Sequence, residues 1–244
     1  MTARPRLPRL PGWGAWLLVL GAGLGANLLN NAAAPGWYLV TSLVTSAFLL
    51  AVARWTGISW LDLGLARDTW RIGAVWAAAV IALVASGYAI ASVLPWTRGL
   101  FDDNRVQVDS FGELVFQVFV RIPLGTVVLE EVLFRGVLLA LAARTMGWWR
   151  SAVLSSALFG LWHILPAQGA AGANPAVEDV VSAGGGGTAG LLLAVAGSVL
   201  ATAAAGLVFC WLRIRSGSLL APMGLHWATN GLGYFFASLV RGGW

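Results

Sequence analysis

The fold of this chain is decided by residues 125–140, GTVVLEEVLFRGVLLA, where two glutamates and one arginine interrupt an apolar run. The apolar run extends over residues 113–143, longer than the about 20 residues that a helix needs to cross a bilayer. Each charged residue at the centre of such a helix costs about 2.5–3.5 kcal/mol on insertion scales. Glu130, Glu131 and Arg135 must therefore face protein or water, and the stretch predicts a membrane helix that lines a polar cavity.

The composition of the whole chain agrees with a membrane protein. Of 244 residues, 59% are hydrophobic and 10% are charged, and the mean hydropathy is +0.80, whereas a soluble domain carries about 25% charged residues. The net charge of +5 comes from 15 scattered arginines and no lysine. Nucleic-acid binders instead gather basic residues on one face, so we expect no nucleic-acid partner. The single cysteine, Cys210, excludes an internal disulfide and a multi-cysteine metal site.

Apolar runs bounded by Arg, Trp, Gly or Pro predict an all-α polytopic membrane protein, a bundle of about seven transmembrane helices around an intramembrane polar cavity. The predicted spans are residues 13–33, 37–52, 72–94, 113–143, 151–165, 189–212 and 219–240. Arg121 and Pro123 predict a kink or break in the fourth run, which would allow an eighth, half-length helix. Residues 1–112 carry the first three spans and no chemical motif, and residues 113–244 form the predicted catalytic core.

The arginines indicate how the bundle is oriented, because arginine-rich loops stay in the cytoplasm. With the N-terminus inside, ten arginines fall in cytoplasmic segments: Arg4, Arg6, Arg9, Arg54, Arg67, Arg71, Arg144, Arg150, Arg213 and Arg215. Only Arg98, Arg105 and Arg241 fall outside. We therefore expect a multi-pass membrane protein whose N-terminus lies inside and whose C-terminus lies outside. The arginine-, alanine- and glycine-rich composition favours the bacterial cytoplasmic membrane.

Three segments leave alternatives open. The N-terminal arginines, apolar stretch and Ala32–Ala34 resemble a signal peptide, but the apolar stretch exceeds the about 7–15 residues typical of one, so we interpret it as a retained first span. Residues 55–71 predict a short amphipathic helix on the cytoplasmic surface or an irregular connecting loop. Residues 167–190, with four consecutive glycines, predict a flexible outside loop.

The two glutamates differ in their helical neighbours. Glu131 and Arg135 are four residues apart, which places them on one helix face in the favourable order for an ion pair. Glu130 is rotated by about 100° from Glu131, and Phe134 stands at its i+4 position. Glu130 is therefore the carboxylate that the pattern leaves free for chemistry.

Both histidines of the chain lie within predicted spans. His163 ends the motif Phe159-Gly-Leu-Trp-His163, and His226 and Asn230 are four residues apart on the last span. Glu130 is 14 residues from Arg144 and His163 is 13 residues from Arg150. At about 1.5 Å per helical residue, both lie about 20 Å below the same membrane face. We therefore expect Glu130 and His163 to meet inside the bundle.

These residues suit the hydrolysis of an amide. A glutamate beside a histidine can take a proton from water and deliver hydroxide to a carbonyl, and a His with an Asn can stabilise the resulting oxyanion. The chain lacks a Gly-x-Ser-x-Gly elbow, which disfavours a serine nucleophile. Two other interpretations stay open: a proton-coupled carrier or channel that uses Glu130, Glu131, Arg135 and His163 as a relay, and a catalytically idle membrane scaffold.

The three ordered motifs, Glu130-Glu131-x-x-x-Arg135, Phe159-x-x-x-His163 and His226-x-x-x-Asn230, resemble the intramembrane CAAX-protease and bacteriocin-processing (Abi) enzymes, the CPBP family that includes the Ras-converting endopeptidase. The resemblance covers residues 114–240. It implies a glutamate-dependent intramembrane endopeptidase in which Glu130 and His163 activate water and His226 and Asn230 form the oxyanion hole. Glu131 would be a second essential carboxylate that pairs with Arg135, and Phe159 would be a supporting residue.

The resemblance leaves the metal and the substrate open. We favour a mechanism without a metal or other cofactor, and the alternative is a zinc ion held by Glu130, His163 and His226. The expected partner is a membrane-embedded or lipidated peptide in the bilayer. It could be a prenylated CAAX tail, from which cleavage removes the last three residues, or a bacteriocin leader, a signalling peptide or another membrane protein.

Overall fold

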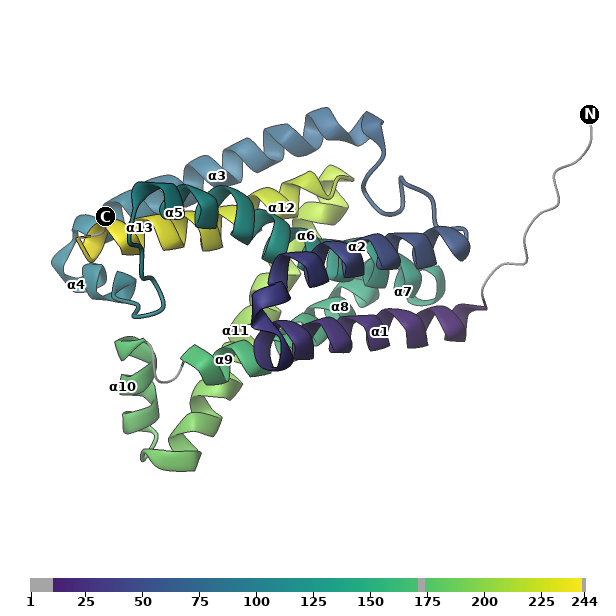
Figure 1. Ribbon diagram of the computed structural model, residues 1–244. Coiled ribbons are helices and arrows are strands. Elements are labelled where there is room, and N and C mark those ends of the chain that lie inside the picture. Colours follow the sequence, from purple (N-terminus) through teal and green to yellow (C-terminus); the bar gives the residue numbers. More distant parts are fainter. Residues whose placement is uncertain (1–10, 171–173, 243–244) are drawn as a thin grey trace, which may run out of the picture.

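A computed structural model of the protein describes residues 11–170 and 174–242, and these residues form helices and connecting turns without strands. Figure 1 shows long helices that run side by side. The unbroken helices of eight or more residues are α1 (Gly12–Leu28), α2 (Tyr38–Trp55), α3 (Trp70–Val93), α8 (Trp148–Trp162), α10 (Pro175–Ala183) and α11 (Gly187–Ser216). Shorter helices are α4 (Pro95–Arg98) and α9 (Ile164–Ala170).

Two further helices consist of consecutive segments with different helical pitch. The first, here called the central helix, joins α5 (Phe111–Phe116), the π-helical η5 (Gln117–Val127), α6 (Val128–Glu130), the π-helical η6 (Glu131–Leu138) and α7 (Leu139–Met146). The second, the last helix, joins α12 (Leu220–Trp227), the π-helical η7 (Ala228–Leu232) and α13 (Gly233–Val240). Wide π turns are rare and often lie at functional sites. Here they occur in both motif-bearing helices and also directly after α1, in η1 (Leu29–Ala33), which carries no motif.

Four helices are long and apolar enough to cross a membrane by length and composition: Gly12–Ala33, Pro35–Trp55, Arg67–Val93 and Gly187–Ser216. They overlap the first, second, third and sixth predicted spans, and the protein is an all-helical integral membrane protein. The other three predicted spans correspond to the central helix, to α8 with α9, and to the last helix. The central helix carries several charges and α8 has only 15 residues, so these three stay predictions as membrane crossings.

Of the kink or break predicted at Arg121 and Pro123, the break does not occur. The chain stays helical from residue 111 to residue 146, and Pro123 lies inside the π-helical segment η5. A proline cannot donate the usual backbone hydrogen bond and its ring displaces the carbonyl before it, which a wider helical turn accommodates. The central helix is therefore one element, and no eighth half-length helix forms from it.

The amphipathic helix predicted at residues 55–71 is wrong, and the alternative of an irregular loop is right. Apart from the end of α2 and the beginning of α3, the segment consists of irregular turns and one 3-10 turn, η3 (Arg67–Thr69). Gly57 and Gly64 have φ angles of 80° and 74°, which end a right-handed helix. Arg213 donates from Nη2 to the carbonyl of Asp62 at 2.7 Å. A Cβ at Gly64 would lie 2.4 Å from Nε of Arg213, so the loop needs glycine there.

The flexible loop predicted at residues 167–190 is also wrong over most of its length. The structure has α9, α10 and the beginning of α11 in this range, and residues 171–173 lie outside the described part. Gly185, Gly186 and Gly187 all have positive φ angles, so the glycine run forms a tight turn between two helices. A Cβ at Gly190 would lie 1.9 Å from the carbonyl oxygen of Val181, so glycine here permits the close approach of α10 and α11.

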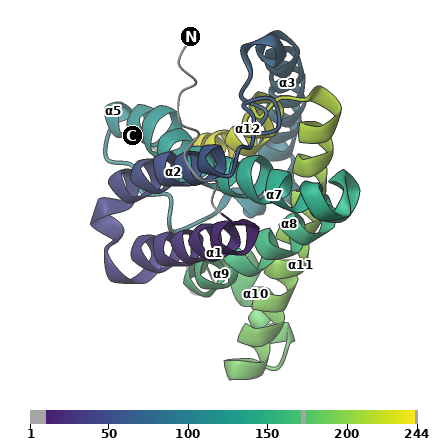
Figure 2. The ribbon, with the colours of Figure 1, turned by 90° about the vertical axis from the view of Figure 1, so that its right-hand side faces the viewer.

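The central helix lies in the middle of the bundle. It contacts α1 and α2 on one side and α8, α11 and α12 on the other, an arrangement that Figures 1 and 2 show from two directions. Its residues 129–142 are all buried, and they form much of the main hydrophobic cluster together with α1, α2 and α8. A helix that is buried on all sides holds any charged residue that it carries inside the protein.

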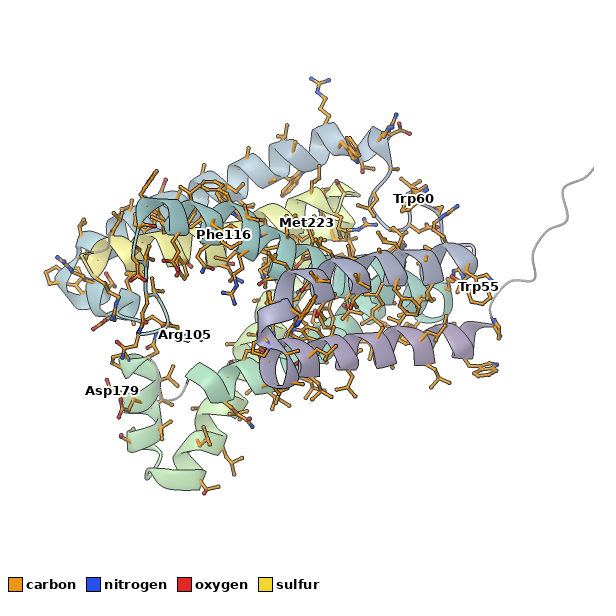
Figure 3. All side chains as sticks on the ribbon, in the orientation of Figure 1. Trp55, Trp60, Arg105, Phe116, Asp179 and Met223 are labelled. Carbon is orange, nitrogen blue, oxygen red and sulfur yellow. The ribbon has the colours of Figure 1, made fainter. Side chains whose placement is uncertain are left out.

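The ends of the bundle differ in character. Figure 3 shows Trp55 and Trp60 at one end and Arg105 and Asp179 at the other. The first end also holds Arg144, which donates to the carbonyl of Thr56. Arg144 and Arg105, which the orientation argument assigned to opposite membrane faces, thus lie at opposite ends of the bundle. Which end faces the cytoplasm stays a prediction.

Candidate active site

The centre of the bundle contains a buried ion pair. Glu131 and Arg135 are both fully buried, and Nη1 of Arg135 donates to Oε1 of Glu131 at 3.0 Å. The i,i+4 pairing predicted from the sequence is therefore present. Nδ1 of His226, on the last helix, lies 2.8 Å from the same Oε1 atom. The Glu131 carboxylate thus joins the central helix to the last helix.

The Arg135 guanidinium lies between aromatic rings. Its Cζ atom is 3.9 Å from the ring centre of Phe159 and 4.7 Å from that of Phe209. Nε and Nη2 are buried and have no hydrogen-bond partner among the described residues. Aromatic faces attract a buried cation, so the Phe159 ring, predicted as a supporting residue, contacts the charge that holds Glu131 in place.

The Glu130 carboxylate is held on one oxygen only. Nε1 of Trp162 donates to Oε1 at 3.0 Å. Oε2 is buried and has no hydrogen-bond partner among the described residues. Nε2 of His226 lies 3.7 Å from Oε2, and Nε2 of His163 lies 4.0 Å from it. The structure therefore brings Glu130 and His163 together, as their equal depth predicted.

The hydrogen bonds of the two imidazoles fix which nitrogen carries the proton in a neutral ring. Nδ1 of His163 lies 2.8 Å from the backbone carbonyl of Phe159, and a carbonyl only accepts. Nδ1 of His226 faces the Glu131 carboxylate that accepts from Arg135. Both Nδ1 atoms are therefore donors, and in the neutral rings both Nε2 atoms turn a lone pair toward Oε2 of Glu130.

This convergence creates a place for a proton donor. One carboxylate oxygen and two imidazole nitrogens face one another across 3.7 and 4.0 Å, too far for a direct hydrogen bond. All three atoms accept hydrogen bonds when the groups are neutral imidazole and carboxylate. A water molecule can donate two hydrogen bonds, and polar groups more than 3.5 Å apart are often bridged by a water. The arrangement suits a water that Glu130 and a histidine deprotonate together.

The pocket beside this cluster has a volume of about 290 Å³ and is lined by Phe159, His163, Thr202, Ala205, Val208, Phe209, Leu225, His226, Thr229 and Asn230. Asn230 is exposed, and its side chain makes no hydrogen bond within the described ranges. The structure places Asn230 on the pocket wall, whereas the His226 ring turns inward to the glutamates. His226 and Asn230 thus contribute to one pocket without contacting each other through a hydrogen bond.

The donor set was also compared with a zinc site. Tetrahedral zinc ligands at about 2.0–2.1 Å from the metal lie about 3.3 Å from one another, and the two separations from Glu130 Oε2 are wider. Within residues 11–170 and 174–242, no group of three or more His, Cys, Asp or Glu side chains is arranged to hold a metal ion. The described side chains, as placed, do not fit the zinc alternative of Glu130, His163 and His226.

Two residues of the cluster were not predicted from the sequence. Trp162 holds Glu130, and the Phe209 ring stacks on the His226 ring with centres 5.3 Å apart and contacts Arg135. Trp162 directly precedes His163, and this adjacency was the available signal. With 14 tryptophans in the chain, however, tryptophan alone has little diagnostic value.

Comparison with known proteins supports the same part of the chain. Residues 112–232 match the family model described as type II CAAX prenyl endopeptidase Rce1-like. The match covers 121 of the 244 residues, about half of the chain, and includes every residue of the buried polar cluster. No curated protein and no solved structure matches the chain.

Proposed function

The chain belongs to the Rce1-like type II CAAX prenyl endopeptidases, a family of proteases, and from this premise we propose that it hydrolyses a membrane-associated peptide with a water molecule activated by Glu130 and His163. The observation that carries the proposal is the convergence of Nε2 of both histidines on the unpartnered Oε2 of Glu130. A buried carboxylate oxygen without a donor calls for an explanation. Oε2 of Glu131 also lacks a donor among the described residues, but it is Oε2 of Glu130 that the two Nε2 atoms approach.

The proposed reaction begins with a water between Glu130 Oε2 and His163 Nε2. Glu130 takes one proton as the water oxygen attacks the scissile carbonyl, and His163 accepts a hydrogen bond from the second proton and orients the nucleophile. The carbon–nitrogen bond then breaks, and the proton held by Glu130 passes to the leaving amine. Trp162 fixes the carboxylate through Oε1, so that Oε2 keeps its direction during both transfers.

The oxyanion would lie toward the pocket wall. The Asn230 side chain is a neutral donor on that wall. A proton on Nε2 of His226, which the ring carries when it is protonated, is the second donor, and Glu131 opposite Nδ1 balances its charge. Such donors supply the electrostatic stabilisation that is usually the largest single contribution to catalysis. Glu131 and Arg135 position His226 and do not touch the substrate.

The proposed substrate class is a prenylated peptide ending in the Cys-aliphatic-aliphatic-X motif, as the family description indicates. The about 290 Å³ pocket beside the histidines is lined mainly by apolar side chains, which suits the aliphatic residues of such a tail. Other hydrophobic peptides of the membrane, a bacteriocin leader among them, offer the same chemistry and are separate outcomes of the test.

The test compares the wild-type protein with Glu130→Gln in liposomes, using a fluorogenic farnesylated Cys-aliphatic-aliphatic-X peptide and its unprenylated twin. We expect Glu130→Gln to lower cleavage by about 10²- to 10⁴-fold, the usual contribution of a general base. Glu178→Gln is the matched control, because Glu178 is exposed on α10 outside the cluster. Cleavage by Glu130→Gln at the wild-type rate contradicts the proposal, and proton-coupled uptake without cleavage supports the carrier alternative.

A further inference from the structure

A second, larger cavity adjoins the pocket of the polar cluster. Its volume is about 660 Å³, and its wall is formed by α3, by residues 100–106, by η5 and by the last helix. Thr229 and Asn230 line both this cavity and the pocket that holds His163 and His226. The two hollows therefore share the Thr229 and Asn230 part of the η7 segment as a common wall.

The second cavity contains two arginines in different electrostatic states. Arg105 makes an ion pair with Asp103 at 2.5 Å, so its charge is balanced. Arg121 donates at 3.3 Å to the amide oxygen of Gln117, which is neutral, and its Cζ atom lies 5.2 Å from the Tyr38 ring centre. Arg121 has no carboxylate within salt-bridge distance among the described residues. It is the unbalanced cation of this cavity.

An arginine without a counter-ion inside a predicted membrane span indicates a binding site for an anion. Arg121 lies in the central helix, within a predicted membrane span, where an ionisable residue is expensive and usually marks a binding or transport path. The guanidinium group is planar and matches a carboxylate with two parallel hydrogen bonds. Its exposure to the cavity leaves its donors accessible to a ligand.

The distance from the polar cluster identifies which carboxylate fits. Arg121 precedes Glu130 by nine residues on the same helix, which corresponds to at most about 13 Å along the axis, since a π-helix rises less than the about 1.5 Å per residue of an α-helix. An extended peptide advances about 3.3–3.6 Å per residue. The span therefore accommodates three residues, and at most four, between the scissile bond and a group at Arg121.

We propose that Arg121 binds the C-terminal carboxylate of the substrate peptide and so makes the enzyme select a free chain end three or four residues beyond the cleaved bond. The inference rests on the proposed function for the position of the scissile bond. It adds a specificity determinant outside the polar cluster, and the cluster itself needs no such anchor for its chemistry. A phosphate group of a lipid is the other anion that a membrane could offer to Arg121.

The test uses two peptides that differ only at the end, the farnesylated reporter with a free C-terminal carboxylate and the same reporter as a C-terminal amide. In the wild type, we expect kcat/KM for the acid to exceed that for the amide by about ten- to a hundredfold, the range of charge-assisted hydrogen bonds. Arg121→Gln should lower kcat/KM for the acid to the value for the amide and leave the amide unchanged. Arg121→Lys should restore part of the preference.

Arg105→Gln is the matched control, because it removes an arginine of the same cavity whose charge Asp103 already balances. We expect it to keep the wild-type ratio between acid and amide. Equal cleavage of both peptides by the wild type overturns the proposal, and so does an equal loss for both in Arg121→Gln. If kcat/KM is equal for the acid and amide peptides but changes with the anionic lipid content of the liposomes, Arg121 binds lipid phosphate instead.

A binding measurement separates this proposal from the proposed function. Glu130→Gln keeps the cavity and removes the base, so the dissociation constants of the acid and amide peptides can be compared without cleavage. Tighter binding of the acid, lost in the double variant Glu130→Gln with Arg121→Gln, supports the anchor even if no peptide is cleaved by the wild type. Equal binding of acid and amide contradicts the anchor whether or not the protein is a protease.

Discussion

The two carboxylates of the polar cluster differ in the groups that hold them. On the side here called the closed side, Glu131 is fully buried and its Oε1 atom meets both Arg135 and His226 within 3.0 Å. On the open side, Glu130 is 5% exposed and its Oε1 atom has one donor, Trp162. Neither Oε2 atom has a hydrogen-bond partner among the described residues, but the Oε2 atom of Glu130 is the one with the Nε2 atoms of both histidines at 3.7 and 4.0 Å. One carboxylate is thus held by an arginine and an imidazole, and the other presents a free oxygen to two imidazoles.

The difference indicates a division of labour between structure and chemistry. A buried carboxylate that accepts from a guanidinium and faces an imidazole is held against movement, which suits a positioning role. The Glu130 carboxylate can pass a proton through its free Oε2 atom, because the hydrogen bond from Trp162 to Oε1 holds the group in place. The same contrast predicts that substitutions on the closed side affect the stability of the protein, whereas substitutions on the open side affect the reaction.

The largest effect is expected on the closed side. Arg135→Met removes the cation and leaves the Glu131 carboxylate buried without it, which costs about 3–5 kcal/mol of folding stability. Glu130→Gln, the matched change on the open side, should alter stability by less than about 1 kcal/mol. Denaturant titrations of both purified variants in the same detergent measure the two values. A smaller loss for Arg135→Met than for Glu130→Gln would contradict the division between the sides.

A double variant sharpens this prediction. Arg135→Met with Glu131→Gln removes both charges, so neither side chain remains as an isolated buried ion. We expect the double variant to be more stable than Arg135→Met alone, although His226 loses its charged partner. If the two single losses instead add in the double variant, the pair is not coupled and the closed side is not held by charge.

The closed side is also the part of the site that the sequence predicts best. The Glu131–Arg135 pair depends only on a spacing of four residues within one helix, and local geometry determines it. The meeting of Glu130 and His163 follows from their equal distances to flanking arginines, which requires only that both helices span the same membrane. The family resemblance drawn from the three motifs is confirmed by the match over residues 112–232.

The rest depends on how helices are rotated about their axes, which spacing does not determine. Trp162 reaches Glu130 because α8 packs closely on α11: a Cβ at Gly160 would lie 2.6 Å from the carbonyl oxygen of Val199, so glycine sets that approach. His226 likewise faces Glu131 while Asn230 lies on the pocket wall, and their spacing of four residues did not predict this difference. The helices of residues 164–183 were missed because alanine and glycine dominate this segment and resemble a linker.

The next effect concerns the single donor on the open side. Trp162→Phe keeps an aromatic ring and removes the hydrogen bond to Glu130, a bond to a charged group of the kind that contributes about 1.5–3 kcal/mol. Because the bond orients the proposed base, we expect kcat to fall about tenfold or more while KM changes little. Steady-state kinetics on the reporter peptide measure both constants.

A matched tryptophan tests whether this effect is specific. Nε1 of Trp70 donates to the carbonyl of Leu65 at 3.3 Å, away from the polar cluster. Trp70→Phe should keep kcat within about twofold, because an exposed substitution rarely changes a distant site. If both variants lose activity equally, Trp162 acts through general packing and the open side does not depend on its indole.

A smaller effect is expected at an ion pair outside the predicted spans. Burial alone would raise the pKa of Asp103, but hydrogen bonds from the side chain and backbone of Arg105 and from Asn174 outweigh it and lower the pKa. A lowered pKa means that the pair stabilises the fold above the ordinary Asp pKa of about 3.9, and that this contribution is lost as the pH falls through the lowered value. Arg105 is half exposed, so the pair contributes at most about 1 kcal/mol.

Asp103→Asn should therefore lower the unfolding temperature at pH 7 by a few degrees and change it little at a pH below the lowered pKa of Asp103, where the carboxyl of the wild type is largely protonated. Thermal unfolding at the two pH values measures the difference. The pair at Glu131 and Arg135 should show a much larger effect at pH 7, because its charges are buried. An equal effect of the two pairs would show that burial does not distinguish them.

The smallest effect is expected from removal of metal ions. In the proposed mechanism Glu130 and His163 activate water directly, and the separations at Glu130 Oε2 are wider than those between zinc ligands. Exhaustive chelation, with the metal content of the purified protein measured before and after, should therefore leave cleavage of the reporter peptide unchanged. Complete loss of activity, restored by zinc and not by magnesium, would mean that the open side closes around a metal in the working enzyme. The free Oε2 atom would then be a ligand and not a base, and Glu130→Gln should abolish zinc binding as well as cleavage.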